Sequence, residues 1–152
     1  MSAAPEMDWT IMAFDELDAL LLHDILRLRV DVFVVEQQCP YPELDGRDAS
    51  AMHVVGRHAD GAVVAYARIL PPGADGLPHV GRVVVAPGLR GAGLGRQLMQ
   101  RVKQALVRQY GDARSALAAQ AHLVPFYRSL GYSPQGAEYL LDGIPHVDMV
   151  HG

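Results

Sequence analysis

Apolar residues near the start of the chain follow two spacings in turn. Trp9 to Phe14 is a short, mostly apolar run that predicts a first strand. Positions three and four apart then form one stripe of a helix, made of Phe14, Leu17, Leu21, Ile25, Leu28, Val32 and Val35. Asp15 is the expected N-cap of this helix. The Val-rich end from Val30 to Val35 also alternates, so the pattern allows a break into two helices there.

Strand patterns dominate the middle of the chain. Three strands are predicted, at Met52 to His58, Ala62 to Leu70 and His79 to Ala86. The first two are joined at Asp60-Gly61, a dipeptide typical of β-hairpins. The run Val83-Val84-Val85 is apolar on both faces, which indicates a central strand. The segment from Cys39 to Ser50 is rich in Pro, Gly and acids and is expected to be a loop.

Helical spacing returns in the second half of the chain, in a stripe of Leu94, Leu98, Val102, Ala105 and Leu106. A strand at Ser115 to Ala121, a short helix at about Val124 to Leu130 and two short strands follow, the last near Pro145 to Val150. The order is strand, helix or helices, three strands, helix, strand, helix, two strands. That order excludes a simple alternating Rossmann domain and predicts one mixed sheet with helices on both faces, an α/β (mixed α+β) fold.

Composition narrows the class of protein. The chain has 152 residues, half of them hydrophobic and a fifth charged, so we expect a single domain over residues 1–152. A net charge of −4 gives no general attraction to nucleic acid or anionic membranes. The single Cys39 excludes an internal disulfide, Met1 to Trp9 lacks the pattern of a secretory signal, and no apolar stretch reaches a membrane-spanning length. We therefore expect a cytoplasmic protein. His53, His58 and His79 lack metal-ligand spacing, and no metal is expected.

The most informative stretch is the buried Val strand followed by a glycine-rich turn that opens into a helix. Gly91, Gly93 and Gly95 leave the main chain without Cβ atoms, so several N–H groups can approach one ligand. The helix start adds free N–H groups, and Arg90 and Arg96 add positive charge. This combination predicts a phosphate or pyrophosphate site. The Lys of a Walker loop is absent, and the glycine spacing differs from the dinucleotide fingerprint. A turn whose glycines serve geometry alone is the remaining alternative.

Two segments in order resemble the signatures of a known family. Arg90-Gly91-Ala92-Gly93-Leu94-Gly95 resembles the coenzyme-binding motif of the GCN5-related N-acetyltransferases (GNAT). Phe126 to Tyr132 resembles the second signature of that superfamily, and Val32 to Asp48 with Gly143 to His146 resembles its ElaA-type branch. The resemblance implies a mixed, mostly antiparallel sheet of six or seven strands, splayed between strands 4 and 5, with about four helices on both faces.

The resemblance also implies a coenzyme site for acetyl-CoA. The pantetheine arm would pair with the strand at Val83 and Val85, and the pyrophosphate would lie on the amides from Arg90 to Arg96. The implied coenzyme-binding residues are Val83, Val84, Val85, Arg90, Gly91, Ala92, Gly93, Leu94, Gly95, Arg96 and Gln120. Gln120 stands where many relatives carry Asn, and Tyr127 would be the general acid that protonates the departing thiolate.

The acceptor side has weaker signals. A lysine-like amine has a pKa of about 10.4, so it must lose a proton before it can attack. Candidate bases or substrate-side groups are His122, Glu36, Glu138 and His146, with His122 first because it is close to Tyr127 in the sequence. The acidic loop with Glu43, Asp45 and Asp48 is a further candidate, as an attraction for a cationic acceptor.

The leading hypothesis is direct transfer of an acetyl group from acetyl-CoA to a primary amine on a small molecule or peptide. The first alternative is a non-catalytic acyl-CoA-binding or regulatory module. The second is an acetyltransferase-like factor acting on charged tRNA, which the acidic balance disfavours. Neither the acceptor nor the acyl-chain length follows from the sequence, and a homodimer is allowed only by analogy with the superfamily.

Overall fold

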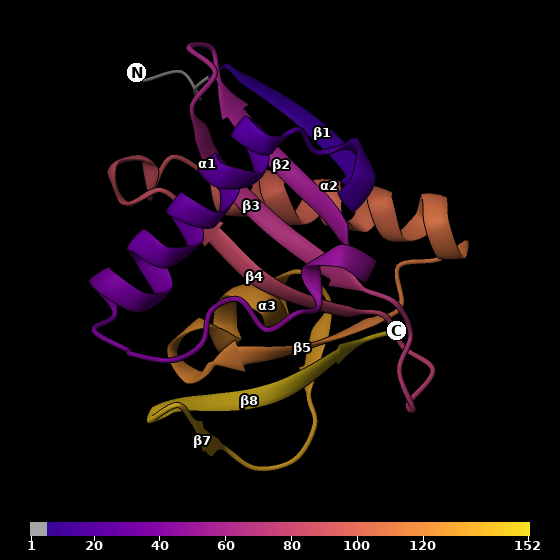
Figure 1. The fold of residues 1–152 in the computed structure, drawn as a ribbon. Coiled ribbons are helices and arrows are strands. Elements are labelled where there is room, and N and C mark those ends of the chain that lie inside the picture. Colours follow the sequence, from indigo (N-terminus) through magenta and orange to yellow (C-terminus); the bar gives the residue numbers. More distant parts are fainter. Residues whose placement is uncertain (1–5) are drawn as a thin grey trace.

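The computed structural model describes residues 6–152, which form one sheet with helices on both faces (Figure 1). The strands are β1 (Met7–Ala13), β2 (Met52–His58), β3 (Val63–Leu70), β4 (His79–Val85), β5 (Ser115–Gln120), β6 (Tyr132–Pro134), β7 (Tyr139–Leu141) and β8 (Ile144–His151). Their order is β1-β2-β3-β4-β5-β8-β6, and β7 pairs with β8 outside that path. All pairs are antiparallel except β4–β5, which is parallel. The predicted fold class is confirmed.

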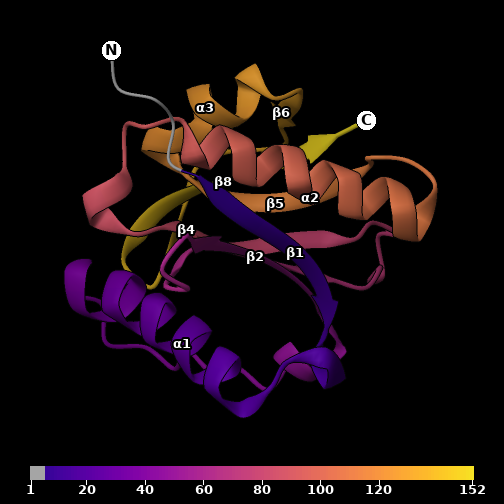
Figure 2. The same cartoon turned by 90° about the horizontal axis from the view of Figure 1, so that it is seen from above.

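Three α-helices cover the two faces of the sheet: α1 (Ala19–Val30), α2 (Leu94–Tyr110) and α3 (Val124–Ser129). Figure 2 shows α1 on one face and α2 with α3 on the other. The α1 face buries Leu21, Ile25, Leu28 and Val32 against Val55, Tyr66 and Val84. On the opposite face, α2 buries its whole predicted stripe, from Leu94 to Leu106, with each stripe side chain at most 1% exposed. The 3.6-residue pattern therefore located both helical cores.

The first helix differs from the prediction at both ends. Residues Phe14–Glu16 form a 3₁₀ turn (η1), and the N-cap of α1 is Asp18, whose carboxylate accepts the amide of Leu21 at 2.7 Å. The prediction of Asp15 as the N-cap was wrong. At its far end α1 passes into a π-helical segment, η2 (Asp31–Glu36), which leaves Val35 64% exposed. The wider π-helical turn rotates the last residues away from the stripe.

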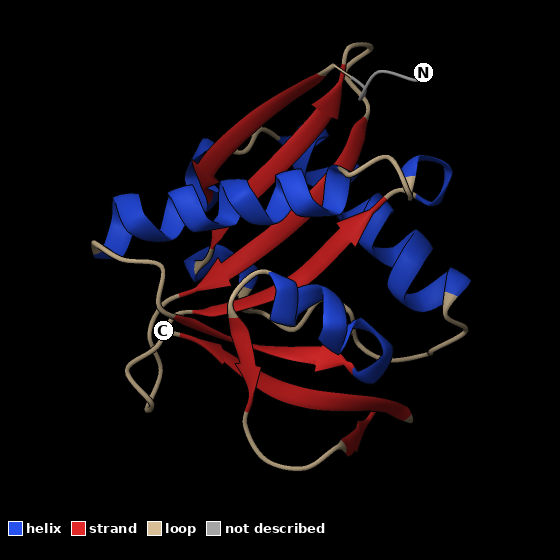
Figure 3. Cartoon of the chain, turned by 180° about the vertical axis from the view of Figure 1, so that it is seen from behind, coloured by secondary structure: helices blue, strands red, loops and turns tan. Residues whose placement is uncertain are grey.

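Strands β4 and β5 separate soon after they meet. Only His79 and Ala116 pair between them, and the amide of Ala116 donates to the carbonyl of Pro78 at 2.9 Å. Beyond this point the two strands fan apart (Figure 3). From Val80 to Val85 the outer edge of β4 therefore has no strand partner among the described residues. An unpaired edge of this kind is a template for an added strand-like ligand.

A bulge in β4 determines what each side chain of that strand faces. Arg82 has φ +53°, and the register with β3 slips between Gly81 and Val84. The extra residue resets the alternation, so Val84 faces α1 while Val83 and Val85 pack on the α2 and α3 side. The side chain of Arg82 instead reaches the loop between η2 and β2, where it contacts Glu43.

Element counts depart slightly from expectation, with eight strands and three α-helices among residues 6–152. The additional strand is β7, joined to β8 by a tight turn at Asp142-Gly143, where both residues have positive φ. That Asp-Gly dipeptide is the same hairpin signal that correctly joined β2 to β3. The prediction for Met1 to Trp9 lies partly outside the described residues, and the single domain over 1–152 stays a prediction. No helix within residues 6–152 is long and apolar enough to span a membrane.

Candidate functional site

The glycine-rich turn before α2 presents unused main-chain donors. Gly91 and Gly93 have φ +85° and +81°, and Gly93 is the N-cap of α2. Within the described chain, the amides from Gly91 to Arg96 donate no hydrogen bond, whereas the amide of Arg90 donates to Pro87 at 3.5 Å. A Cβ atom at Gly91 or Gly93 would meet no other atom within 4 Å. The glycines therefore serve an open, left-handed turn with free N–H groups, which suits an anion.

The two arginines of this turn have partners already. Arg90 forms a two-bond ion pair with Glu36 of η2, at 2.5 and 2.7 Å, and its Nε donates to the carbonyl of Val85 at 3.2 Å. The guanidinium lowers the pKa of Glu36, mainly through these hydrogen bonds. Arg96 donates to the hydroxyl of Ser129 at 3.1 Å and lies over the ring of Phe126. Glu36 is therefore a charge partner of the loop, and its role on the acceptor side stays a prediction.

A cavity of about 560 Å³ opens between the glycine turn, β4 and η2, and we name it the loop cavity. It is lined by Val32, Phe33, Glu36, Gln37, Val83, Val84, Val85, Leu89, Arg90, Gly91, Gly93, Gly95, Arg96, Gln120, His122, Leu123, Phe126 and Tyr127. Most predicted coenzyme residues are in this set. Ala92 and Leu94 are not, and the side chain of Leu94 is 1% exposed in the core. Leu94 can contribute its amide alone.

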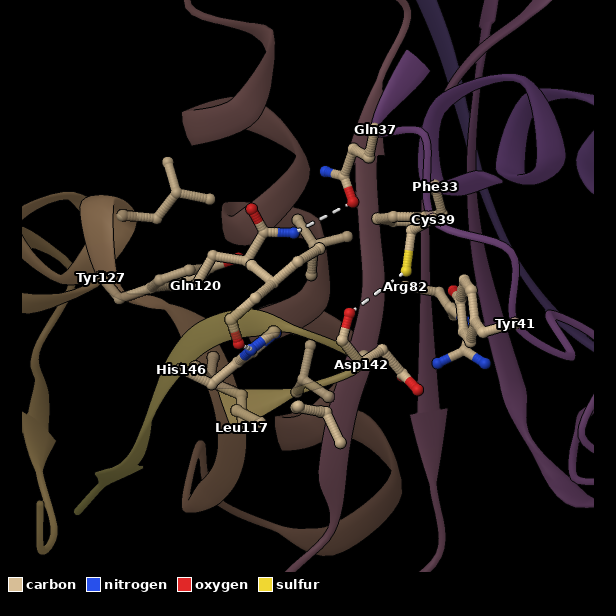
Figure 4. Close-up of a pocket in the computed structure, with 17 residues that line it drawn as sticks. Phe33, Gln37, Cys39, Tyr41, Arg82, Leu117, Gln120, Tyr127, Asp142 and His146 are labelled. Atoms are coloured by element: carbon tan, nitrogen blue, oxygen red, sulfur yellow. Dashed lines mark hydrogen bonds between the residues drawn. The ribbon is translucent and has the colours of Figure 1, made fainter. Parts of the chain in front are cut away.

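A second cavity of about 200 Å³ lies in the gap between β4 and β5, and we name it the inner cavity (Figure 4). Its polar lining includes Cys39, Tyr41, Arg82, Asp142 and His146. Six residues line both cavities and define a waist between them: Phe33, Gln37, Val83, Gln120, Leu123 and Tyr127. At the waist the amide of Gln120 donates to the side-chain carbonyl of Gln37 at 3.3 Å. The two cavities therefore adjoin at these shared residues.

Tyr127 is the hydroxyl-bearing residue of the waist. Helix α3 places it at 5% exposure, with an edge-on contact to Phe126 at 5.1 Å between ring centroids. Its hydroxyl makes no hydrogen bond to another residue in the described part of the chain. Burial raises the pKa of Tyr127 well above its usual value, so the phenol holds its proton. A protonated, unpartnered hydroxyl at this position is suited to donate to a ligand.

The two candidate histidines lie on different sides of the waist. His122 is exposed in the 3₁₀ turn η5 (Ala121–Leu123) and lines the loop cavity. His146 is 9% exposed on β8, pairs in register with Gln120, and lines the inner cavity. Glu138 is exposed in the loop before β7 and lines neither cavity. The prediction of Glu138 as a substrate-side residue therefore gains no support from either cavity and stays a prediction.

The loop between η2 and β2 is fixed by a buried network of charges. Arg29 contacts Glu43 at 2.6 Å and Asp48 at 2.8 Å, Arg68 contacts Asp45 at 2.6 Å and Asp48 at 3.1 Å, and Arg82 contacts Glu43 at 2.9 Å. Arg29 is fully buried. Hydrogen bonds from Arg68 lower the pKa of Asp45. Burial alone would raise the pKa of Asp48, but the contacts with Arg29 and Arg68 lower it overall. Three guanidinium groups and three carboxylates leave the network neutral.

This network overturns the prediction that the acidic loop attracts a cationic acceptor. Each of its three carboxylates is neutralised by an arginine, so little negative potential reaches the solvent. The network instead shapes the inner cavity, because Arg82 lies over the ring of Tyr41 and both residues line it. The thiol of Cys39 donates to the carbonyl of Asp142 at 3.5 Å, which joins the same loop to the β7–β8 turn.

Several lining residues escaped the sequence analysis, among them Phe33, Gln37, Tyr41 and Arg82. Arg82 had a usable signal, since an arginine inside an otherwise apolar central strand demands a charged partner. The others lie in the segment that resembles the ElaA branch, but nothing in their spacing placed them at a cavity. Within residues 6–152, no three His, Cys, Asp or Glu side chains group as a metal site.

Known proteins are similar to this chain in both sequence and fold. The family model of the acetyltransferase (GNAT) domain matches residues 22–151. Protein ElaA of Escherichia coli is 42% identical over 146 residues, which cover 94% of this chain and 95% of that protein, and its crystal structure superimposes with a TM-score of 0.89. The crystal structure of an acyl-CoA N-acyltransferase from Pseudomonas aeruginosa superimposes with a TM-score of 0.91 at 41% identity, covering 97% and 100% of the two chains. A CoA-dependent acyl-homoserine lactone synthase, BjaI, shares the fold with a TM-score of 0.79 at 19% identity, over 95% and 82%.

Proposed function

We propose that this chain, which belongs to the GNAT acetyltransferase family and its ElaA-type branch, transfers an acetyl group from acetyl-CoA to a primary amine. The family and fold support acyl transfer from coenzyme A as the general reaction. One observation carries the finer proposal: two cavities, of different lining, meet at a waist that contains a protonated, unpartnered tyrosine.

The loop cavity supports the coenzyme half of this proposal. The free amides from Gly91 to Arg96 supply several donors at the positive end of α2, which fits a pyrophosphate. The unpaired edge of β4 at Val83 and Val85 then suits the amides of a pantetheine arm, which would lead the thioester to the waist. A volume of about 560 Å³ falls in the usual range of ligand pockets.

Tyr127 has a defined part in the chemistry. The amine nitrogen forms a bond to the thioester carbonyl carbon, the C–S bond breaks, and the electron pair leaves on sulfur. The Tyr127 hydroxyl gives its proton to that sulfur, while a strand N–H polarises the carbonyl. Transfer is direct in this proposal, because the thiol of Cys39 has only the carbonyl of Asp142 as a hydrogen-bond partner among the described residues, and no base contacts it to take its proton.

The inner cavity would hold the acceptor. At about 200 Å³ the inner cavity is smaller than the loop cavity, which favours a small amine or the tip of a peptide side chain. Its polar lining would orient such a group toward Tyr127. A cytoplasmic location, a homodimer and the lack of a nucleic-acid partner remain predictions.

A single assay tests the proposed function. Acetyl-CoA is titrated into the protein by calorimetry, and free thiol is then followed with a panel of polyamines, amino sugars, amino acids and short peptides. We expect saturable binding and thiol release above hydrolysis with at least one small amine. Binding without release for every acceptor would instead support the non-catalytic acyl-CoA-binding module, and an absence of binding would reject both.

A further inference from the structure

One buried imidazole has a nitrogen that no protein group uses. Nδ1 of His146 lies 2.7 Å from the carbonyl of Ile144. A carbonyl only accepts, so Nδ1 carries the proton and the lone pair of the neutral ring is on Nε2. In the described chain Nε2 has no hydrogen-bond partner, and it is not among the fully enclosed unsatisfied atoms. The residue is 9% exposed and lines the inner cavity, so the cavity is what gives access to the lone pair.

The fold holds this ring firmly at the proposed acceptor position. His146 is the third residue of β8 and pairs with Gln120, a residue of the waist. Its ring stacks on Tyr139 at 6.2 Å between centroids, with 28° between the planes. Figure 4 shows His146 on the wall of the cavity that Tyr127 and Gln120 also line. Ring and backbone contacts thus fix both the tautomer and the direction of Nε2.

The other candidates for a base are less suitable. His122 is exposed and lies on the loop-cavity side of the waist. Glu36 forms a two-bond ion pair with Arg90, which makes its carboxylate a weaker proton acceptor. Glu138 lines neither cavity. Among the sequence candidates, only His146 offers an unused lone pair where an acceptor would enter.

We propose that Nε2 of His146 is the general base that takes the proton from the acceptor amine; the assignment rests on the proposed function. The bound ammonium gives one proton to Nε2, and the freed nitrogen lone pair attacks the thioester carbonyl carbon. The C–S bond breaks, and sulfur takes the proton of the Tyr127 hydroxyl. The second proton lost by the nitrogen restores that hydroxyl, and His146 releases its own proton to solvent through the cavity.

The test uses the full chain and the small amine that gives the fastest thiol release in the panel. We expect His146→Ala to lower kcat at least about 100-fold, with the Kd for acetyl-CoA unchanged. Imidazole added to the buffer should restore part of that rate by occupying the space left by the ring. The matched control, His23→Ala, removes an exposed histidine that lines neither cavity, so it should keep its kcat and gain nothing from imidazole. His146→Gln, which fills the site without a basic nitrogen, replaces His146→Ala if the latter does not fold.

The outcomes separate this assignment from the reaction itself. Thiol release by the wild type together with normal kcat in His146→Ala or His146→Gln overturns the role of His146 and leaves the proposed function intact. A loss of rate that imidazole does not restore, with an equal loss of acetyl-CoA affinity, assigns His146 a structural role and also overturns the proposal. A wild type that releases no thiol with any amine overturns the proposed function and this assignment with it.

Discussion

The loop cavity and the inner cavity share one waist, yet they are made of different parts of the polypeptide. The phosphate end of the loop cavity is main chain, since Gly91 and Gly93 in left-handed conformations expose amides with nothing above them. The inner cavity is made of side chains from separate stretches of sequence, such as Tyr41, Arg82 and His146, held by tertiary contacts. A main-chain site depends on local conformation, whereas a side-chain site depends on the whole fold around it.

That difference predicts distinct responses to mutation. Changes in the buried charge network should damage the inner cavity and the stability of the protein while sparing coenzyme affinity. Changes in the glycine turn should weaken coenzyme binding and leave the inner cavity intact. The four substitutions below test this separation.

Glu43→Gln should have the largest effect. It removes one negative charge from a network in which Arg29 is fully buried, leaving an uncompensated guanidinium. Breaking a buried pair costs about 3–5 kcal/mol, which corresponds to a fall in Tm of roughly 10 °C for a chain of this size. Thermal unfolding measures it, with the exposed Glu138→Gln as control. At temperatures where the variant is folded, acetyl-CoA should still bind; a loss of binding there would contradict the separation of the two cavities.

Tyr127→Phe comes next and acts at the waist itself. Without the hydroxyl, the departing thiolate has no proton donor, and kcat should fall about 100-fold while the Kd for acetyl-CoA is unchanged. Tyr132→Phe is the matched control, because Tyr132 is equally buried and its hydroxyl contacts Ser115 at 2.6 Å, away from both cavities. The control should lose about 1 kcal/mol of stability and keep its kcat. Normal turnover by Tyr127→Phe would remove the tyrosine from the mechanism.

Gly93→Ala tests the main-chain phosphate site at the end of the loop cavity. At φ +81° an alanine is strained by roughly 1–2 kcal/mol and would shift the turn from the dihedrals that expose its amides, so acetyl-CoA should bind about tenfold more weakly. Calorimetry measures the affinity. Gly76→Ala provides the control, since Gly76 has φ +75° and equally open surroundings in the loop before β4. Equal affinities of the two variants would show that the Gly93 turn does not hold the coenzyme.

The same contrast explains what the sequence could predict. Gly91, Gly93 and the valines of β4 were recognisable in the sequence because glycine adopts those dihedrals without strain and a central strand is apolar on both faces. Helical spacing likewise located the core stripe of α2. The role of Glu43 was misjudged because its partners, Arg29 and Arg82, are 14 and 39 residues away. No local sequence pattern predicts a contact over such a separation. The bulge that directs Arg82 to Glu43 forms only when β3 and β4 pair.

Glu36→Gln should have the smallest effect. It acts on the ion pair that joins η2 to the glycine turn. In the free protein Arg90 is held by Glu36 and by the carbonyl of Val85, so a pyrophosphate must compete with a carboxylate for the guanidinium. Glutamine removes that competing charge, and acetyl-CoA should bind more tightly, by at most about fivefold because the pair is exposed. The gain should shrink as salt is added, since screening weakens the attraction of Arg90 for phosphate.

The control for Glu36→Gln is Asp31→Asn, which removes a charge from the same π-helical segment but lies outside both cavities. It should leave the affinity unchanged at every salt concentration. Weaker binding by Glu36→Gln would reverse the interpretation, because the carboxylate would then hold Arg90 in position for the phosphates. In that case a side chain of η2 belongs to the phosphate site, and the loop cavity depends on tertiary contacts as much as the inner cavity does.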